Sequence, residues 1–225
     1  MKKSIGIIGC SNFGLSLITS LSKFNDIEIL AIDSRIEAIT KAANIIKHAY
    51  LCDPTSEDAL REVGMQNVDE VVVAIGQSEP EGLVNTIIST IMLKRIGINK
   101  ITLRLDDPSY ESILKTLGAT NFINPMKVAC DKVANTLAYE NIVDYFDVAG
   151  QYTIYEIILP DTFRPLVLCD LRAKAKFETN IILVNRNKKT ISPSGSTVLQ
   201  PNDQIYIFSE KSKINKIVSF FNNYV

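Results

Sequence analysis

The sequence has no tryptophan, one histidine and no closely spaced cysteines. Without a Cys-x-x-Cys pair there is no support for a structural zinc site or a redox motif, and scattered thiols fit a reducing cytosol. The cysteines are Cys10, Cys52, Cys130 and Cys169. For the one histidine, His48, we expect a structural role more than catalysis or metal binding.

Long apolar runs and an excess of one charge are also missing. The formal net charge is −1, so nothing indicates a nucleic-acid partner. The first apolar run, Ile5–Ile8, is too short for a signal-peptide core. The longest one with helical spacing, Leu83–Ile98, is broken by polar and charged residues, whereas a membrane span needs roughly 18 apolar residues. We therefore expect a folded cytoplasmic protein that does not cross a membrane.

Strands and helices alternate up to about residue 138, which predicts an α/β fold with a doubly wound parallel sheet. Asx-Pro pairs at Asp53-Pro54, Asp107-Pro108 and Asn124-Pro125 predict helix starts, because the Asx side chain caps and proline suits the first helical position. The predicted strands are Ser4–Ile8, Glu28–Ile32, Ala49–Cys52, Val71–Ile75, Lys100–Leu105 and Asn121–Ile123.

After about residue 139 the pattern changes to short strands separated by turn-rich stretches. The strands are Tyr152–Leu159, Ile181–Val184 and Gln204–Phe208, and a last helix runs from about Lys211 to Phe221. We interpret this part as a second, smaller α+β domain. The chain is thus divided into residues 1–138 and 139–225, which the helix Pro125–Leu137 connects.

A variant of the dinucleotide fingerprint follows the first strand: Gly9-x-Ser11-x-x-Gly14. Gly9 permits the tight turn, Gly14 lets the helix pack closely, and the helix N-terminus presents free N–H groups to phosphate. Asp33 ends the second strand, where an acid binds ribose hydroxyls, although it could equally cap the next helix. A carboxylate here disfavours the 2′-phosphate of NADP, an effect that the nearby Arg35 weakens.

The C-terminal ends of five strands carry residues suited to a ligand: Gly9, Asp33, Asp53, Gly76 and Arg104. In a doubly wound sheet, ligands bind at this edge. Arg104 alternates with apolar neighbours and suits a phosphate. The competing interpretations are a helix cap for Asp53 and a solvated surface charge for Arg104. We favour a nucleotide site.

Catalytic motifs are not apparent. There is no Gly-x-Ser-x-Gly elbow, no Tyr-x-x-x-Lys pair and no metal cluster, and the second domain leaves little room for a substrate pocket. We therefore predict a ligand-sensing module without catalytic residues. The alternative is a small NAD-dependent oxidoreductase, which turnover of NADH with a panel of carbonyl compounds would favour.

The chain resembles the RCK (KTN) regulators of potassium conductance, most closely the regulatory subunits of Ktr and Trk uptake systems. The resemblance covers nearly the whole chain and rests on the order of several short motifs. In the first part they are residues 9–14, 31–33, 71–76, 117–119 and 123–125. In the second part they are residues 171–177, 191–193 and 202–207.

The resemblance implies an RCK N-domain that binds ATP, ADP or NAD(H), followed by a TrkA-C-like regulatory domain. It also implies homodimers in a ring, expected to be octameric, at the inner face of the membrane beneath a membrane-embedded potassium channel subunit. The nucleotide-site residues that we predict are Gly9, Ser11, Asn12, Phe13, Gly14, Asp33, Ser34, Arg35, Asp53, Ala74, Ile75, Gly76 and Arg104.

In some relatives the C-terminal module binds cyclic di-AMP between two chains. By position the candidates here are Leu168, Cys169, Asp170, Lys174, Asn180 and Pro193. Asn180 follows Lys174 at the spacing seen in relatives that bind this messenger. In the competing interpretation Lys174 belongs to a solvated basic face and Asn180 is a turn residue.

Departures from the family pattern affect both sites. Asn12 stands where members often carry an arginine that contacts the ATP γ-phosphate. Met126 stands where a glutamate can bind a divalent cation, so we predict no metal there. Lys174 replaces an arginine and Glu178 a glycine. Lysine keeps the positive charge but loses the bidentate fork of arginine.

Overall fold

The computed structural model describes residues 2–77, 80–138, 141–172 and 176–224, with only the backbone of Asn135. The chain forms two compact units, Met1–Lys127 and Val128–Val225, and the division falls within helix α6 (Pro125–Ala138). The boundary that the sequence suggests, 138/139, lies at the other end of the same helix. We describe each unit by itself, as the N-unit and the C-unit.

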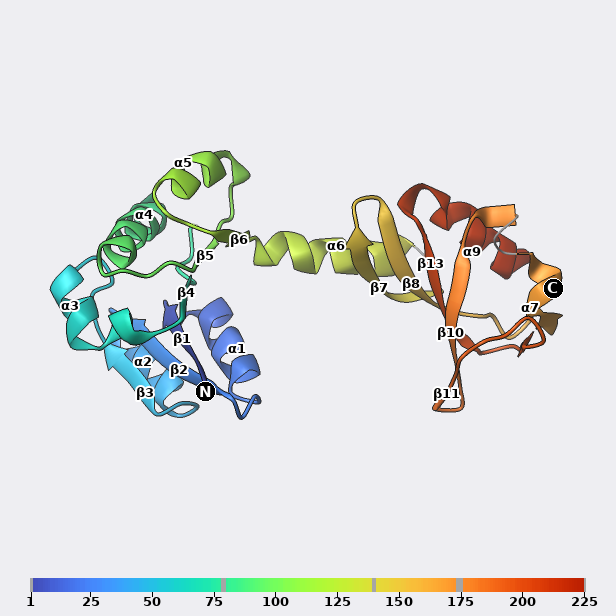
Figure 1. The fold of residues 1–225 in the computed structure, drawn as a ribbon, viewed down its shortest axis with the longest axis horizontal. Coiled ribbons are helices and arrows are strands. Elements are labelled where there is room, and N and C mark those ends of the chain that lie inside the picture. The colour runs from blue at the N-terminus through green and yellow to red at the C-terminus, as the bar shows by residue number, and fades with distance from the viewer. Residues whose placement is uncertain (1, 78–79, 139–140, 173–175, 225) are drawn as a thin grey trace. The chain divides into compact units, whose positions relative to one another are not determined.

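The N-unit is built on one parallel sheet in the order β3-β2-β1-β4-β5-β6 (Figure 1). The order reverses direction at β1 and β4, which confirms the predicted doubly wound architecture. Every strand predicted for this unit is present; β6 has the predicted bounds, and the others differ by one or two residues at one or both ends. The strands are β1 (Lys3–Ile8), β2 (Ile27–Asp33), β3 (His48–Leu51), β4 (Glu70–Val73), β5 (Ile101–Arg104) and β6 (Asn121–Ile123).

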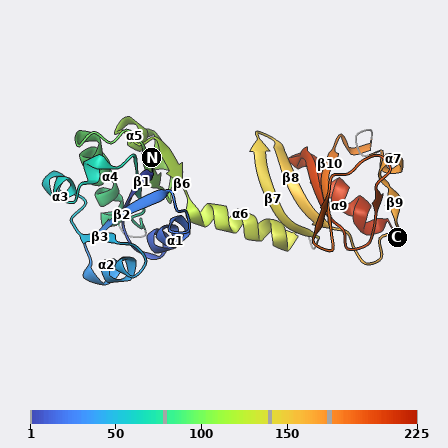
Figure 2. The same ribbon diagram turned by 60° about the horizontal axis from the view of Figure 1, so that its bottom comes forward.

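Helices cover the sheet on two sides (Figure 2). On one face α1 (Asn12–Leu21) and α2 (Ile36–Ala43) pack on β1 and β2 around Ile7 and Ile18. On the other face α3 (Glu57–Glu62), α4 (Pro80–Arg95) and α5 (Glu111–Thr116) cover a core that includes Ile8, Val73 and Leu103. The single-turn 3₁₀ helix η1 (Met65–Asn67) adds Met65 to this core, and a second one, η2 (Pro108–Tyr110), directly precedes α5.

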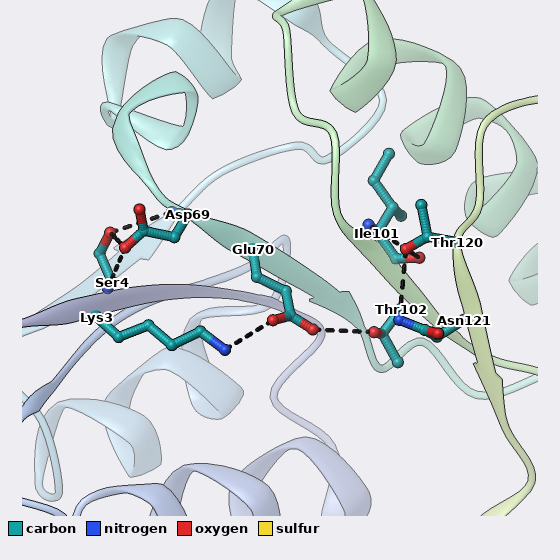
Figure 3. Close-up of polar contacts among 8 residues, drawn as sticks. All are labelled: Lys3, Ser4, Asp69, Glu70, Ile101, Thr102, Thr120 and Asn121. Carbon is teal, nitrogen blue, oxygen red and sulfur yellow. Dashed lines mark hydrogen bonds and ion pairs between the residues drawn. The ribbon is translucent and has the colours of Figure 1, made fainter.

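The amino-terminal ends of the strands carry polar side chains (Figure 3). Glu70 joins three strands, since it accepts hydrogen bonds from Lys3 Nζ at 2.8 Å and from Thr102 Oγ1 at 3.3 Å. The bond from Lys3 lowers the pKa of Glu70. Next to it, Asp69 accepts from the backbone N–H and the hydroxyl of Ser4. These pairs connect β1, β4 and β5 at the edge opposite to the predicted ligand site.

Two glycines allow strand-to-helix loops at the carboxyl edge to pack against the helices that follow. A Cβ built on Gly14 lies 1.9 Å from the carbonyl oxygen of Gly9, and one built on Gly82 lies 1.9 Å from that of Gly76. Real Cβ atoms do not approach a backbone oxygen so closely. Gly9 itself has φ = 97°, a conformation that favours glycine. In both the β1–α1 and the β4–α4 loop, a helix glycine thus allows a loop carbonyl to approach the helix closely.

Two of the three Asx-Pro helix starts are confirmed. Asp107 accepts from Ser109 N at the start of η2, and Asn124 Oδ1 accepts from Lys127 N at the start of α6. The prediction for Asp53-Pro54 is wrong. Asp53 Oδ1 accepts from the N–H of Thr55, which makes an Asx turn, and α3 begins only at Glu57 with Ser56 as its cap.

The C-unit contains an antiparallel sheet in the order β11-β10-β13-β8-β7, and α9 (Ile214–Asn223) packs on it through Ile217 and Phe221 (Figure 1). Helix α9 begins at Ile214 and not at the predicted Lys211, because Lys211–Lys213 form a 3₁₀ turn, η3. The strands are β7 (Ile142–Ala149), β8 (Tyr152–Ile158), β10 (Asn180–Arg186), β11 (Lys189–Ile191) and β13 (Gln204–Glu210). A small second sheet pairs β9 (Leu166–Val167) with β12 (Val198–Leu199).

The sequence did not predict β7, β9, β11, β12 or the short helix α7 (Leu168–Leu171). Strand β7 lies at the edge of its sheet, and most of its residues are exposed or half-buried, so it lacks a clear apolar alternation. The others are only two to four residues long. Strand β11 forms a hairpin with β10, whereas β9 and β12 pair with each other across a longer stretch of chain. Elements this short carry too little local pattern to be predicted.

The close approach at Gly14 predicts that Gly14→Ala lowers the stability of the N-unit by about 1–3 kcal/mol, the usual cost of an overpacked site. The matched control is Gly76→Ala, whose Cβ meets only Arg104 Nη1 at an ordinary 3.7 Å. Thermal unfolding of both variants by circular dichroism measures the difference. A Gly14→Ala midpoint equal to that of wild type would show that the loop relaxes without cost.

Candidate functional site

Two adjoining cavities lie at the carboxyl edge of the N-unit sheet, and Ser11, Arg35 and Gly76 line both. We call them the loop cavity and the strand cavity. The loop cavity, of about 450 Å³, is lined by Cys10, Ser11, Asn12, Phe13, Leu15, Arg35, Glu37, Ala38, Lys41, Gly76 and Arg104. The strand cavity, of about 440 Å³, is lined by Ile8, Gly9, Ser11, Asp33, Ser34, Arg35, Asp53, Pro54, Ile75, Gly76, Glu81, Gly82 and Asn85.

Most residues of the predicted nucleotide site therefore gather here. Two of them do not line either cavity. Ala74 is fully buried beneath the β1–α1 loop, and Gly14 lies against the carbonyl of Gly9. Their part is to let the loop and the first turn of α1 approach the sheet closely.

Asp33 is the most highly coordinated group of the site. Its Oδ2 accepts from the backbone N–H of Cys10 at 2.7 Å and from Arg35 Nη2 at 3.0 Å. Its Oδ1 accepts from the backbone N–H of Arg35 at 2.9 Å and from Arg35 Nε at 3.0 Å. A carboxylate has about four lone-pair positions, and all of them are used. Asp33 thus ties the β1–α1 loop to the end of β2.

These contacts fix the charge of the site. Burial opposes ionisation of Asp33, but the hydrogen bonds from Arg35 and from the Cys10 amide outweigh it and lower the pKa of the carboxyl. For the neighbouring Cys10, burial and then the Asp33 carboxylate raise the thiol pKa to about 12. At neutral pH the site therefore holds an ionised carboxylate and a protonated thiol, and Cys10 is not a nucleophile.

Arg104 is held in place as well. Its Nε and Nη2 both donate to Asp106 at 2.9 Å, and its guanidinium carbon lies 5.9 Å from the centre of the Phe13 ring. Gln77 connects the neighbouring loops, because its Nε2 donates to the Arg104 carbonyl and its Oε1 accepts from the Asp106 N–H. Arg104 is thus a positioned, mostly buried cation rather than a solvated surface charge.

Asp53 provides an acceptor to the strand cavity. Its Oδ1 accepts from the N–H and the hydroxyl of Thr55, whereas its Oδ2 accepts no hydrogen bond from the described residues. This oxygen is available to a ligand donor such as a ribose hydroxyl or an exocyclic amino group.

The sequence did not single out four polar residues that line the cavities. Glu37 and Lys41 lie on α2 and line the loop cavity, and Glu81 and Asn85 lie on α4 and line the strand cavity. Each pair is four residues apart and so shares one face of its helix. The signal in the sequence that could have found them is a pair of polar residues, four apart, on a helix that follows the end of a strand.

In the C-unit, part of the predicted cyclic di-AMP site comes together. Helix α7 carries Leu168, Cys169 and Asp170, and its first two amides donate to the carbonyls of Thr197 and Gly195, in the turn that follows Pro193. Asn180 is the first residue of β10, where it pairs with Phe208 of β13. Lys174 lies outside the described residues.

The backbone on both sides of residues 173–175 adopts left-handed conformations, at Arg172 (φ 48°) and Glu178 (φ 52°). The position of Glu178 is therefore one that glycine suits, in keeping with the glycine of the family pattern. The Glu178 side chain pairs with Lys213, which precedes α9.

In the described part of the chain, no group of three or more His, Cys, Asp or Glu side chains is arranged to hold a metal ion. Among the same residues, no helix has both the length and the apolar character to span a membrane.

Two family models match the chain, the TrkA-N domain over residues 5–125 and the TrkA-C domain over residues 168–222. Two relatives from Bacillus subtilis (strain 168) match over nearly the full length of both chains. Ktr system potassium uptake protein C is 29% identical over 217 residues, which cover 96% of each chain. Ktr system potassium uptake protein A is 26% identical over 215 residues, which cover 95% of each chain.

Solved structures share the fold. The GsuK channel superposes with a TM-score of 0.63 at 13% identity, over 99% of this chain and 40% of the channel chain. The GsuK channel bound to NAD gives a TM-score of 0.62 at 14% identity, again over 99% and 40%. This chain therefore spans less than half of those channel chains.

The TrkA-N match covers more than half of the chain, and it coincides with the parallel sheet whose carboxyl edge carries the two cavities. The TrkA-C match covers most of the C-unit. The chain belongs to the TrkA-N family and carries a TrkA-C domain after its TrkA-N domain.

Proposed function

We propose that this protein is the cytoplasmic regulatory subunit of a Ktr- or Trk-type potassium uptake system and is not an enzyme. The observation that carries the proposal is the carboxyl edge of the N-unit sheet, where the glycine loop, Asp33 and Asp53 surround two adjoining cavities. Full-length similarity to Ktr system potassium uptake proteins supports the coupling of this site to potassium transport.

Regulation through such a site requires that the ligand bind two conformations of the assembly unequally, because a ligand with equal affinity for both shifts nothing. The protein would act on a membrane-embedded potassium channel subunit, at the inner face of the membrane. The direct test is potassium uptake by the organism that carries this gene. Its deletion should lower uptake at limiting external potassium, and the wild-type gene should restore it; unchanged uptake would contradict the proposal.

We propose that the N-unit ligand is an adenine nucleotide: ATP, ADP or NAD(H). The strand cavity offers Asp53 Oδ2 and the Asn85 side chain to the nucleoside, while the amides at the start of α1 and the basic side chains Arg35, Lys41 and Arg104 suit phosphates. Mass spectrometry of nucleotides released from the denatured protein would identify the physiological ligand.

Asp53→Asn tests the nucleotide site while keeping the Asx turn, because the amide oxygen still accepts from Thr55. The second carboxylate oxygen becomes a donor, and a hydrogen bond to a charged group worth about 1.5–3 kcal/mol is lost. We expect affinity for ADP to fall by about tenfold or more in calorimetry. Asp58→Asn, an exposed site on α3 outside the cavities, is the control. Equal ADP affinities for wild type and Asp53→Asn would rule out Asp53 as a ligand.

We further propose that the chain forms homodimers that assemble into an octameric ring. Helix α6 supports this, since Met126, Val128, Val133 and Leu137 are all more than half exposed, from 56% to 80%. Apolar side chains in such number on one helix favour coverage by a second copy.

We also propose that the C-unit of the dimer binds cyclic di-AMP across its two-fold axis, with Leu168, Cys169 and Asp170 of α7, Lys174, Asn180 and Pro193. A symmetric dinucleotide suits an isologous interface, because its two halves meet the same residues from two chains. Titration of the full chain, followed by calorimetry and light scattering, should give one messenger per two chains. The absence of saturable binding below about 1 mM, or binding to a monomer, would end this proposal.

A further inference from the structure

The end of β2 holds an arrangement that differs from the usual ribose site. In a dinucleotide-binding fold the acid at this position accepts a hydrogen bond from the ribose 2′-hydroxyl. Here the four lone-pair positions of Asp33 are filled by Cys10 and Arg35, and Asp33 is only 5% exposed. A 2′-hydroxyl finds no free acceptor on Asp33 unless the Arg35 guanidinium leaves.

Arg35, by contrast, is open to a ligand. Its side chain is 61% exposed and it lines both cavities. Of the five N–H donors of a guanidinium, Nε and one on Nη2 are used on Asp33, so the others remain for a ligand. Arg35 thus presents donors at the place where Asp33 would otherwise present acceptors.

Residues around Arg35 add another hydrogen-bond donor and another positive charge. Ser34, the residue between Asp33 and Arg35, lines the strand cavity and has a hydroxyl that can donate. Lys41 lines the loop cavity beside Arg35. The negative charges that oppose a phosphate here are Asp33, which pairs with Arg35, and Glu37, which lines the loop cavity. Asp53 and Glu81, which line the strand cavity, oppose it as well.

We propose that Arg35 determines which nucleotides the N-unit accepts, and that with Ser34 it forms a subsite for a phosphate on the ribose 2′-oxygen, as in NADP. This inference rests on the proposed adenine nucleotide site. It replaces the expectation that Asp33 disfavours a 2′-phosphate, because the carboxylate is paired with Arg35 and does not act as an unscreened negative charge. Arginine suits this role, since its planar fork binds Asp33 with one edge and leaves donors for a phosphate.

The test compares ligands that differ only in the 2′-phosphate: NAD with NADP, and 5′-AMP with adenosine 2′,5′-bisphosphate. Calorimetry on the wild-type protein should give affinities within about tenfold for each pair. In Arg35→Ala, the affinity for the 2′-phosphorylated partner should fall by at least about tenfold relative to the other, because Asp33 then faces the phosphate without its counter-charge. Arg35→Lys, which keeps the charge but loses the fork, should lie between them.

Arg61→Ala is the matched control, since Arg61 is an exposed N-unit arginine that pairs with Glu57 outside both cavities. It should leave all four affinities unchanged. Thermal unfolding of Arg35→Ala and Arg35→Lys identifies any loss of folding, and if Arg35→Ala does not fold, the ratio measured for Arg35→Lys decides.

The outcomes are distinct. If wild type binds NAD and 5′-AMP but neither 2′-phosphorylated partner, the 2′-phosphate subsite is wrong and the nucleotide site stands. The subsite is also wrong if the Arg35 variants change both members of each pair equally. If none of the four ligands, nor ATP or ADP, binds wild type, the proposed nucleotide site fails and the subsite with it.

Discussion

The carboxyl edge of the N-unit depends on one buried carboxylate. Asp33 accepts hydrogen bonds from the Cys10 amide, in the loop after β1, and from the backbone and side chain of Arg35 after β2. Two loops that are distant in sequence therefore share one acceptor. An ionised carboxylate this deeply buried is tolerated because its hydrogen bonds replace those of water. The shape of both cavities follows from this constraint, since Arg35 lines each of them.

The same edge suits the proposed role in ligand sensing. The loops carry amides, an acceptor at Asp53 and positioned cations at Arg35 and Arg104, which are suited to binding and orientation. In the proposed assembly, the exposed apolar residues of α6, the helix that begins at the end of this unit, would carry the contact between copies. A nucleotide that stabilises one arrangement of the loops would then shift the equilibrium between two conformations of the ring. The size of the shift is set by the difference between its affinities for the two conformations.

Much of the N-unit could be predicted because its signals are local. Each buried parallel strand is a short apolar run, and the turn after the first one needs glycine at Gly9 and Gly14, so the sequence shows them directly. The saturation of Asp33 by Arg35 could not be predicted, since it depends on a rotamer and on an amide from another loop. Likewise, the strands of the C-unit that the sequence did not predict are short or exposed, so their apolar pattern in the sequence is weak.

Asp33 holds the two loops of the ligand edge together. Amide hydrogen exchange measures this directly, because the N–H groups of Cys10 and Arg35 both donate to Asp33. In Asp33→Ala, these two amides should exchange at least about tenfold faster than in wild type, which corresponds to a loss of about 1.4 kcal/mol of protection. The amides of Gly6 and Ile7 within β1 should keep their rates. Unchanged exchange at Cys10 and Arg35 would contradict the account.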